Sequence, residues 1–254
     1  MRFASLGSGS RGNAWVIESG RSRVLLDCGF SLSATMQRLA RFGLDAANLD
    51  AILVTHEHTD HAGGVFRLAR RYGLTVCLSH GTLSALGDAA AAGCRLQLLH
   101  AGEPFALGDL QVEPFTIPHD AREPLQFVFG NGAVRLGFLT DAGHVSAHVE
   151  QVLRGCEGLV LESNHDPELL RTGRYHHALK ARVAGRHGHL SNDEAAALLS
   201  RLAGPHLRQV VAAHLSEENN RPELARAAFA GVLAGAAGDV AIAGQADGLD
   251  WRSL

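Results

Sequence analysis

The sequence predicts an α+β fold in which two β-sheets pack face to face and helices cover both outer faces, a four-layer αββα sandwich. Short apolar strands bounded by Gly, Ser and Asn clusters dominate the first part of the chain, and strands alternate with helical segments along the rest. The turn residues at 130–132 separate two further apolar runs and predict a two-stranded unit in the middle of the chain. We expect one domain over residues 1–254, and the pattern is compatible with two similar halves that meet near residue 100.

The expected strands are short apolar runs that end in turn residues. They are 2–6, 14–18, 23–27, 51–55, 75–78, 110–117, 125–129, 134–140, 158–162 and 210–213. The expected helices have apolar residues at helical spacing, and Ser31 or Ser33 can cap the first of them. They are 31–42, 64–72, 82–92, 145–153, 192–202 and 222–234.

The composition narrows the class of protein. With 254 residues and 46% hydrophobic residues, the chain can bury a large core. The 4 cysteines are scattered without a C-x-x-C pair, which favours reduced thiols over disulfides or a zinc site built on sulfur. A secretory leader and a membrane helix of about 18 apolar residues are both missing from the pattern, so we expect a cytoplasmic protein without a membrane partner. A net charge of −3 means that any polyanion must bind locally.

The run 55–61 holds four side chains of the kinds that bind metal ions. His56, His58, Asp60 and His61 follow the expected strand 51–55 directly and precede a Gly-Gly helix start. Imidazole and carboxylate groups are the usual ligands of zinc and also bind manganese. A polar turn whose histidines only bond to the backbone is the alternative, but packing requires no such cluster. The pattern therefore predicts a site for two divalent metal ions and a hydrolytic enzyme.

This run resembles the signature of the metallo-β-lactamase superfamily. Other segments resemble the YycJ/WalJ group of that superfamily, so that the resemblance extends from residue 3 to about residue 220. These segments are 6–14, 27–29, 118–121, 139–143, 162–166, 188–192 and 214–220. Members of that group are regarded as DNA exonucleases, so the resemblance implies the metallo-β-lactamase fold, DNA as the substrate and two metal ions, zinc or manganese.

The resemblance also implies a complete set of metal ligands. The set consists of His56, His58, Asp60, His61, His119, Asp141 and His214. One metal ion would bind the first two histidines with His119 and Asp141, and the other would bind the remaining ligands, with Asp141 bridging both. Independently of the resemblance, His119, Asp141 and His214 each follow an expected strand, where side chains converge on one sheet edge. Exposed loop histidines and a turn-forming aspartate are the alternative interpretation.

Asp60 and His189 are the expected catalytic residues. Asp60 is a metal ligand whose loss should abolish activity, and His189 is our candidate for the acid that protonates the leaving oxygen. Alternatively, His189 only neighbours Ser191, which caps the helix 192–202, and the two roles are compatible.

A basic stretch between residues 171 and 189 offers a path for a phosphate backbone. It contains five fixed positive charges, four histidines and no acidic residue. Arginine can contact a phosphate through two nitrogens, so we expect Arg182 and Arg186 to bind substrate. A solvated helix face is the alternative. The remaining candidates for substrate contact are Asn164, His165 and Ser191.

The leading functional hypothesis is therefore a two-metal phosphodiesterase that acts on DNA as an exonuclease. The alternatives are a thioester hydrolase of the glyoxalase II type and a phosphodiesterase for a small cyclic phosphate. An antibiotic-cleaving role is disfavoured because the resemblance makes Asp141 a bridging ligand, which is typical of the phosphodiesterase and glyoxalase branches. A non-catalytic scaffold is disfavoured because no ligand is missing. The oligomeric state is not predicted.

Overall fold

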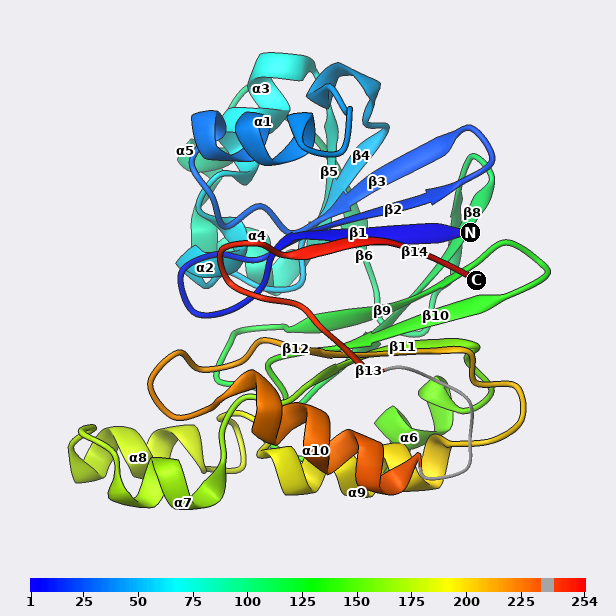
Figure 1. Ribbon diagram of the computed structural model, residues 1–254. Helices are drawn as coiled ribbons and strands as arrows, with labels where there is room; N and C mark the ends of the chain where they lie inside the picture. Colours follow the sequence, from blue (N-terminus) through cyan, green and yellow to red (C-terminus); the bar gives the residue numbers. More distant parts are fainter. Residues whose placement is uncertain (234–239) are drawn as a thin grey trace.

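The computed structural model describes residues 1–233 and 240–254, and it has four layers (Figure 1). Two sheets pack against each other in the middle, and helices cover the outer face of each. Within the described residues, the first sheet has the strand order β14-β1-β2-β3-β4-β5-β6 and the second has the order β13-β12-β11-β10-β9-β8-β7. The expected αββα sandwich is therefore confirmed, and the change of sheet falls between β6 and β7, close to residue 100.

Each sheet has an antiparallel part and a parallel part. The first sheet contains β1 (Arg2–Gly7), β2 (Ala14–Ser19), β3 (Ser22–Leu26), β4 (Ala51–Leu53), β5 (Thr75–Ser79), β6 (Arg95–Leu99) and β14 (Leu249–Ser253). The second contains β7 (Phe105–Leu107), β8 (Leu110–Thr116), β9 (Leu125–Gly130), β10 (Arg135–Leu139), β11 (Gly158–Glu162), β12 (Gln209–Ala213) and β13 (Val240–Ile242). Strands β3 to β6 are mutually parallel, as are β10 to β13, so their carboxyl ends lie at a common edge in each sheet.

The helices divide between the two outer faces. Near the first sheet lie α1 (Leu32–Ala40), the short 3₁₀ helix η1 (Ala46–Asn48), α2 (Thr59–Ala62), α3 (Val65–Tyr72), α4 (His80–Leu86) and α5 (Asp88–Ala91). On the second sheet lie α6 (Ala147–Leu153), α9 (Asn192–Leu202) and α10 (Pro222–Val232), while α7 (Pro167–Thr172) and α8 (His177–Val183) project beyond its end (Figure 1). Among the described residues, no helix has the length and apolar character needed to cross a membrane.

Successive side chains of a central strand pack on opposite faces of its sheet, one face toward the other sheet and one toward the helices. In β11, Leu159 and Leu161 pack with the helices below the second sheet, whereas Val160 between them packs against the first sheet. This is the two-residue period of a strand that is buried on both faces. Each fully buried apolar side chain of this size contributes about 1.5–3 kcal/mol to the free energy of folding. The core between the two sheets and the two cores under the helices therefore hold the sheet edges in fixed positions.

Several elements differ from the expectation. The expected helix 82–92 is split into α4 and α5, because Gly87 has φ +85° and ends the first helix. Strands β6, β7, β13 and β14 and helices α7 and α8 were not predicted. Strand β6 lies at the edge of its sheet, and its apolar residues Leu96 and Leu98 are exposed. The last residue of the expected helix 222–234, Ala234, lies outside the described residues.

Two sequence-based helix starts are confirmed. Ser31 caps α1 by accepting a hydrogen bond from the Ala34 N–H. Ser191 caps α9 in a capping box with Glu194, so that two otherwise free N–H groups at the start of this helix are bonded.

The segment after β3 lies directly against the 60–64 loop. The Cys28 N–H donates to the His61 carbonyl, and the Gly64 N–H donates to the Cys28 carbonyl. A Cβ on Gly29 would lie 1.8 Å from the Asp60 carbonyl oxygen, so only glycine allows this approach. These contacts place Asp27, at the end of β3, beside the histidine run.

Candidate metal centre

The expected metal ligands meet at the carboxyl ends of strands from both sheets. His56, His58, Asp60 and His61 follow β4, His119 follows β8, Asp141 follows β10, and His214 follows β12. Their ligand atoms form overlapping groups in which all atoms lie within 4.8 Å of one another. The groups are His56/His58/His119, His56/His61/Asp141, Asp60/His61/His214 and Asp141/Glu162/His189/His214. The structure thus brings all seven sequence-predicted ligands together.

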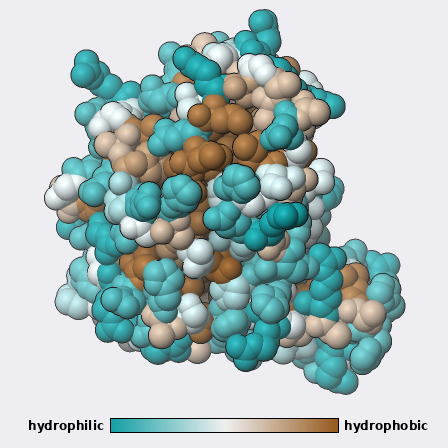
Figure 2. Space-filling model, turned by 180° about the vertical axis from the view of Figure 1, so that it is seen from behind, coloured by the Kyte–Doolittle hydropathy of each residue, from teal (hydrophilic) through white to brown (hydrophobic). Residues whose placement is uncertain are grey.

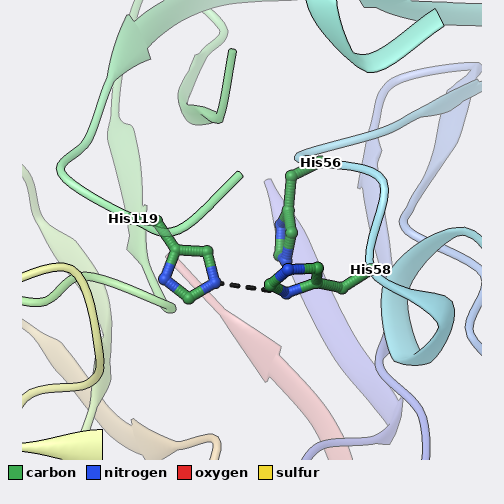
Figure 3. Close-up of side chains that lie close together, drawn as sticks. All are labelled: His56, His58 and His119. Carbon is green, nitrogen blue, oxygen red and sulfur yellow. Dashed lines mark hydrogen bonds between the residues drawn. The ribbon is translucent and has the colours of Figure 1, made fainter. Parts of the chain in front are cut away.

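The first group consists of three imidazoles (Figure 3). His56 and His58 come from one loop, and His119 approaches from the other sheet. His58 Nδ1 and His119 Nε2 are 3.3 Å apart, and His56 Nε2 is buried without a hydrogen-bond partner. The nitrogens therefore point into a shared space between the two sheets.

The second group combines imidazoles with carboxylates. The Asp60 Oδ2 atom lies 3.5 Å from His61 Nε2 and 3.7 Å from His214 Nε2. Asp141 lies between the two groups, because its Oδ2 is 3.3 Å from His61 Nε2 and its Oδ1 is 3.9 Å from His119 Nε2. This central position is the one that a bridging carboxylate requires.

Most of the imidazoles have their second nitrogen bonded away from the centre. His61 Nδ1 lies 2.8 Å from Asp27 Oδ2, and His214 Nδ1 lies 2.9 Å from Glu162 Oε1. His119 Nδ1 faces the Gly188 carbonyl at 3.2 Å. Each of these acceptors holds a proton on Nδ1 and leaves Nε2 with a lone pair, which is the form that binds a metal ion.

The arrangement fits divalent metal ions. Three buried atoms at the centre, His56 Nε2, Asp141 Oδ2 and His214 Nε2, have no hydrogen-bond partner. A buried polar atom without a partner is unfavourable by about 1–3 kcal/mol. Since the atoms are nitrogen and carboxylate oxygen donors directed at one another, cations that accept them all account for the arrangement.

The electrostatics of the centre keep its carboxylates ionised. Burial alone would raise the pKa of Asp141, but His214 and His61 outweigh it and hold that pKa well below its usual range. The pKa of Asp60 is lowered in the same way. Burial would raise it, but hydrogen bonds and charge from His214 and His61 outweigh that effect. In contrast, burial lowers the pKa of His56, because no carboxylate bonds to its ring. At the other two histidines the carboxylates outweigh burial, so that the pKa of His214 is raised to about 10 and the pKa of His61 lies well above its usual range. The centre therefore combines ionised carboxylates with histidine nitrogens at which a metal ion would replace a proton.

The backbone is strained at the same place. Asp27, Asp141 and His214 are the non-glycine residues with positive φ in the described chain, at +61°, +59° and +56°. A left-handed conformation costs about 1–2 kcal/mol at such a residue. All three residues belong to the centre, so the surrounding packing holds these side chains in directions that a relaxed backbone would not give.

His189 lies at the mouth of the centre. It lines a cavity of about 200 Å³ together with His58, Asp60, Asp141 and His214. Its Nδ1 lies 2.8 Å from Glu162 Oε1, and its side chain is 23% exposed. Burial lowers the pKa of His189, but the charge of Glu162 outweighs it, so the net shift is upward.

The other expected substrate contacts do not lie together at the metal centre. Arg182 borders the cavity, where it pairs with Asp120 at 2.6 Å. Arg186 contributes its carbonyl to a bond with His144 Nδ1. Asn164 is buried and donates to the His214 carbonyl, so it supports a ligand loop. His165 and Ser191 line a separate cavity beside α7 and α8.

The basic stretch 171–189 is not free of acidic partners in space, which corrects the expectation of an uncompensated strip. Arg171 pairs with Glu168, Arg174 with Glu218 and Arg182 with Asp120. The acids come from outside the stretch, so a count along the sequence does not detect them. Of the three arginines, Arg182 is the one that reaches the cavity at the centre.

Sequence reasoning assigned no role to the buried groups that orient the ligands. Asp27 accepts hydrogen bonds from the Thr55 N–H and hydroxyl as well as facing His61. Glu162 is fully buried and has a pKa lowered to about 2, because His189 and His214 outweigh the effect of burial. Asp27 directly follows β3 and Glu162 is the last residue of β11, so each lies at the carboxyl end of an apolar strand, as the ligands do. An acidic residue at such a strand end was the available signal.

Comparison with known proteins shows the family of this chain. Residues 22–215 match the family described as the β-lactamase superfamily domain. The chain therefore belongs to the metallo-β-lactamase superfamily. Over 92% of its length it is 36% identical to the exodeoxyribonuclease YycJ of Bacillus anthracis, covering 89% of that protein, and 35% identical to the exodeoxyribonuclease WalJ of Streptococcus pneumoniae, covering 88%. Within the superfamily it is thus a YycJ/WalJ-like protein.

Solved structures support the same fold at lower sequence identity. The metallo-β-lactamase fold protein YhfI of Bacillus subtilis superimposes with a TM-score of 0.77 at 15% identity, with 99% of this chain and 98% of that chain covered. The short form of human tRNase Z superimposes with a TM-score of 0.69 at 16% identity, with 100% and 99% covered. At this level of identity the likeness concerns the fold alone.

We predict that Asp27→Asn weakens metal binding about 10–100-fold, the usual effect of losing a carboxylate that orients a metal-binding imidazole. Asparagine has nearly the same size and tolerates the left-handed backbone, so the change removes mainly the charge. Competition with a chromogenic chelator measures the affinity. Asp250→Asn, on an exposed position of β14, is the control and should retain the original affinity. Equal affinity of both variants would contradict the role given to Asp27.

Proposed function

We propose that this protein is a two-metal phosphodiesterase that removes nucleotides from the ends of DNA. The observation that carries the proposal is the central carboxylate Asp141, which lies between two groups of ligands at the floor of a cavity bordered by Arg182. The likeness to proteins named exodeoxyribonucleases over 92% of the chain supports DNA as the substrate.

The proposed ligands divide between two metal ions, zinc or manganese. His56, His58 and His119 would hold one, and Asp60, His61 and His214 the other, with Asp141 shared. When bound, such ions supply an activated water molecule and neutralise charge on the attacked phosphate. The role of the chain is to hold the ligand nitrogens in their deprotonated form, which Asp27 and Glu162 do by binding the opposite ring nitrogens.

His189 is the proposed proton donor for the leaving oxygen. Its Nδ1 is bound to Glu162, which leaves Nε2 as the nitrogen available to the cavity. A DNA leaving group is an alkoxide, which needs a proton as the phosphorus–oxygen bond breaks. His189 lines the same cavity as Asp60 and Asp141, so its ring lies beside the place where the phosphate would be attacked.

Arg182 is the proposed contact for a phosphate of the strand. Its side chain is 64% exposed and is held toward the cavity by Asp120. A phosphate can bind one edge of the planar guanidinium while Asp120 keeps the edge formed by Nε and Nη2, because the group has five N–H donors.

The first test compares substrates. We predict that protein reconstituted with manganese or zinc releases nucleotides from end-labelled DNA and hydrolyses bis-p-nitrophenyl phosphate, and that chelation of the metal stops both. Asp60→Ala should lose both activities, whereas Asp88→Ala, on an exposed helix, should keep them. Turnover of S-lactoylglutathione or of a cyclic nucleotide alone would contradict the proposal and favour a thioester or cyclic-phosphate hydrolase.

The second test depends on the leaving group. We predict that His189→Ala lowers kcat on DNA about 10²–10⁴-fold, because the alkoxide loses its proton donor. The loss on bis-p-nitrophenyl phosphate should be much smaller, since p-nitrophenolate leaves without a proton. His187→Ala, an exposed neighbour, is the control. Metal content is measured in parallel, and its loss in His189→Ala would show that this residue is a ligand instead.

The third test concerns Arg182. We predict that Arg182→Ala raises KM for DNA and lowers by about one the number of ions released on binding, which is measured as the salt dependence of affinity. Arg154 is a matched control, because its side chain is 66% exposed and paired with Glu150, compared with 64% and Asp120 for Arg182. An equal effect of Arg154→Ala would mean that only net charge matters.

A further inference from the structure

A second cavity lies on the other side of α8 from the metal centre. It has a volume of about 550 Å³, is open to solvent and is lined by residues of α7, of α8 and of the start of α9. Leu179 and Val183 of α8 line the cavity at the metal centre, whereas Lys180 and Ala184 line this one. Helices α7 and α8 form the projection at the lower left of Figure 1, and Figure 2 shows from behind that this projection exposes hydrophobic side chains between hydrophilic ones.

The walls of this cavity are largely apolar, and its rim carries two cations and the Glu194 carboxylate, which is bonded to Ser191. Pro167, Leu170 and Ala184 provide apolar surface. Arg171 and Lys180 lie at the same cavity, and the Lys180 ammonium is held by the Arg171 carbonyl at 2.8 Å. An occupant with an apolar face and a nearby negative charge would match both features.

His165 adds a specific polar requirement. The residue is 3% exposed, and its Nδ1 is buried without a hydrogen-bond partner. Leaving such an atom unpaired is unfavourable, and a neutral imidazole has one donor and one acceptor to offer. An aliphatic occupant such as an acyl chain would leave the imidazole unpaired, whereas an occupant with polar groups on the edge of a flat apolar ring would not.

The cavity is connected to the metal centre through shared backbone. Asn164, next to His165, donates from its side chain to the His214 carbonyl and receives the Ser216 N–H on its own carbonyl. Ser191, which pairs with His165 in a short parallel bridge, is two residues from His189. An occupant of this cavity therefore lies against the segment that carries His189 and against a second segment that is hydrogen-bonded to the loop of His214.

We propose that this cavity binds the base of a nucleotide close to the phosphodiester that is cleaved. The inference rests on the proposed function, since it assumes a DNA strand at the metal centre. A nucleobase has the flat apolar faces and the polar edge that the walls and His165 require, and its backbone phosphates would meet Arg171 and Lys180. The base is held there largely by shape and stacking, so every base is accepted.

The experiment scans a DNA strand with single abasic sites. Each oligonucleotide carries one abasic nucleotide at a defined distance from the labelled end, and kcat/KM is measured with the metal-loaded protein. We expect one position, or two adjacent ones, at which the missing base lowers kcat/KM about tenfold, the loss typical of one base contact. In Ala184→Trp the indole fills the cavity, so this dependence on position should disappear.

The control is Ala181→Trp, because Ala181 is exposed on α8 and lines neither cavity. It should keep the positional dependence. Ala181→Trp should hydrolyse bis-p-nitrophenyl phosphate at the original rate, and the thermal unfolding midpoint and the metal content show that both variants are folded and loaded with metal.

Two outcomes would overturn the inference, and they are distinguishable. If DNA is cleaved but every abasic position behaves alike, or if Ala184→Trp keeps the positional dependence, the cavity binds no base. If bis-p-nitrophenyl phosphate is hydrolysed and DNA is not, the proposed DNA substrate is wrong, and the inference that the cavity binds a base is then wrong as well.

Discussion

The buried carboxylate of Glu162 joins three parts of the second sheet into one site. Its Oε1 lies within hydrogen-bond distance of His189 Nδ1 and His214 Nδ1, and its Oε2 accepts the N–H groups of Ala142 and Leu190. The loops after β10, after β12 and before α9 therefore share one anchor. A charged group can be fully buried only if it is bonded on all sides, and Glu162 meets that condition. The directions of both imidazoles follow from this anchor.

Much of the fold and the positions of the expected ligands could be predicted from the sequence, because the signals lie in short segments of the chain. Apolar strands marked the sheets, and the ligand-type residues directly followed them, so convergence at one edge could be inferred without knowing the strand order. The roles of Asp27 and Glu162 could not be inferred in this way. Each acts on a histidine that is 34 or 52 residues further along the chain, and only the pairing of the strands brings the partners together.

The charge pattern of 171–189 shows a second case in which contacts between distant parts of the chain could not be inferred from the sequence. The stretch has no acidic residue, which predicted a free cationic strip. In three dimensions, Glu168, Glu218 and Asp120 pair with three of its arginines. Surface pairs of this kind contribute only about 0–1 kcal/mol each, so a polyanion can still compete for the guanidinium groups. What the acids change is the direction in which each arginine points, and Asp120 directs Arg182 to the cavity.

The left-handed backbone at Asp27, Asp141 and His214 restricts how the centre can be redesigned. Asparagine and glycine adopt this conformation readily, whereas β-branched and bulky residues do so at a larger cost. Exchanging Asp141 or His214 for a different donor to alter metal preference would therefore alter two things at once, the ligand chemistry and the geometry of the main chain. Among the proposed ligands, His56 and His119 do not have a positive φ, so a different donor at these positions would alter the ligand chemistry without this backbone cost.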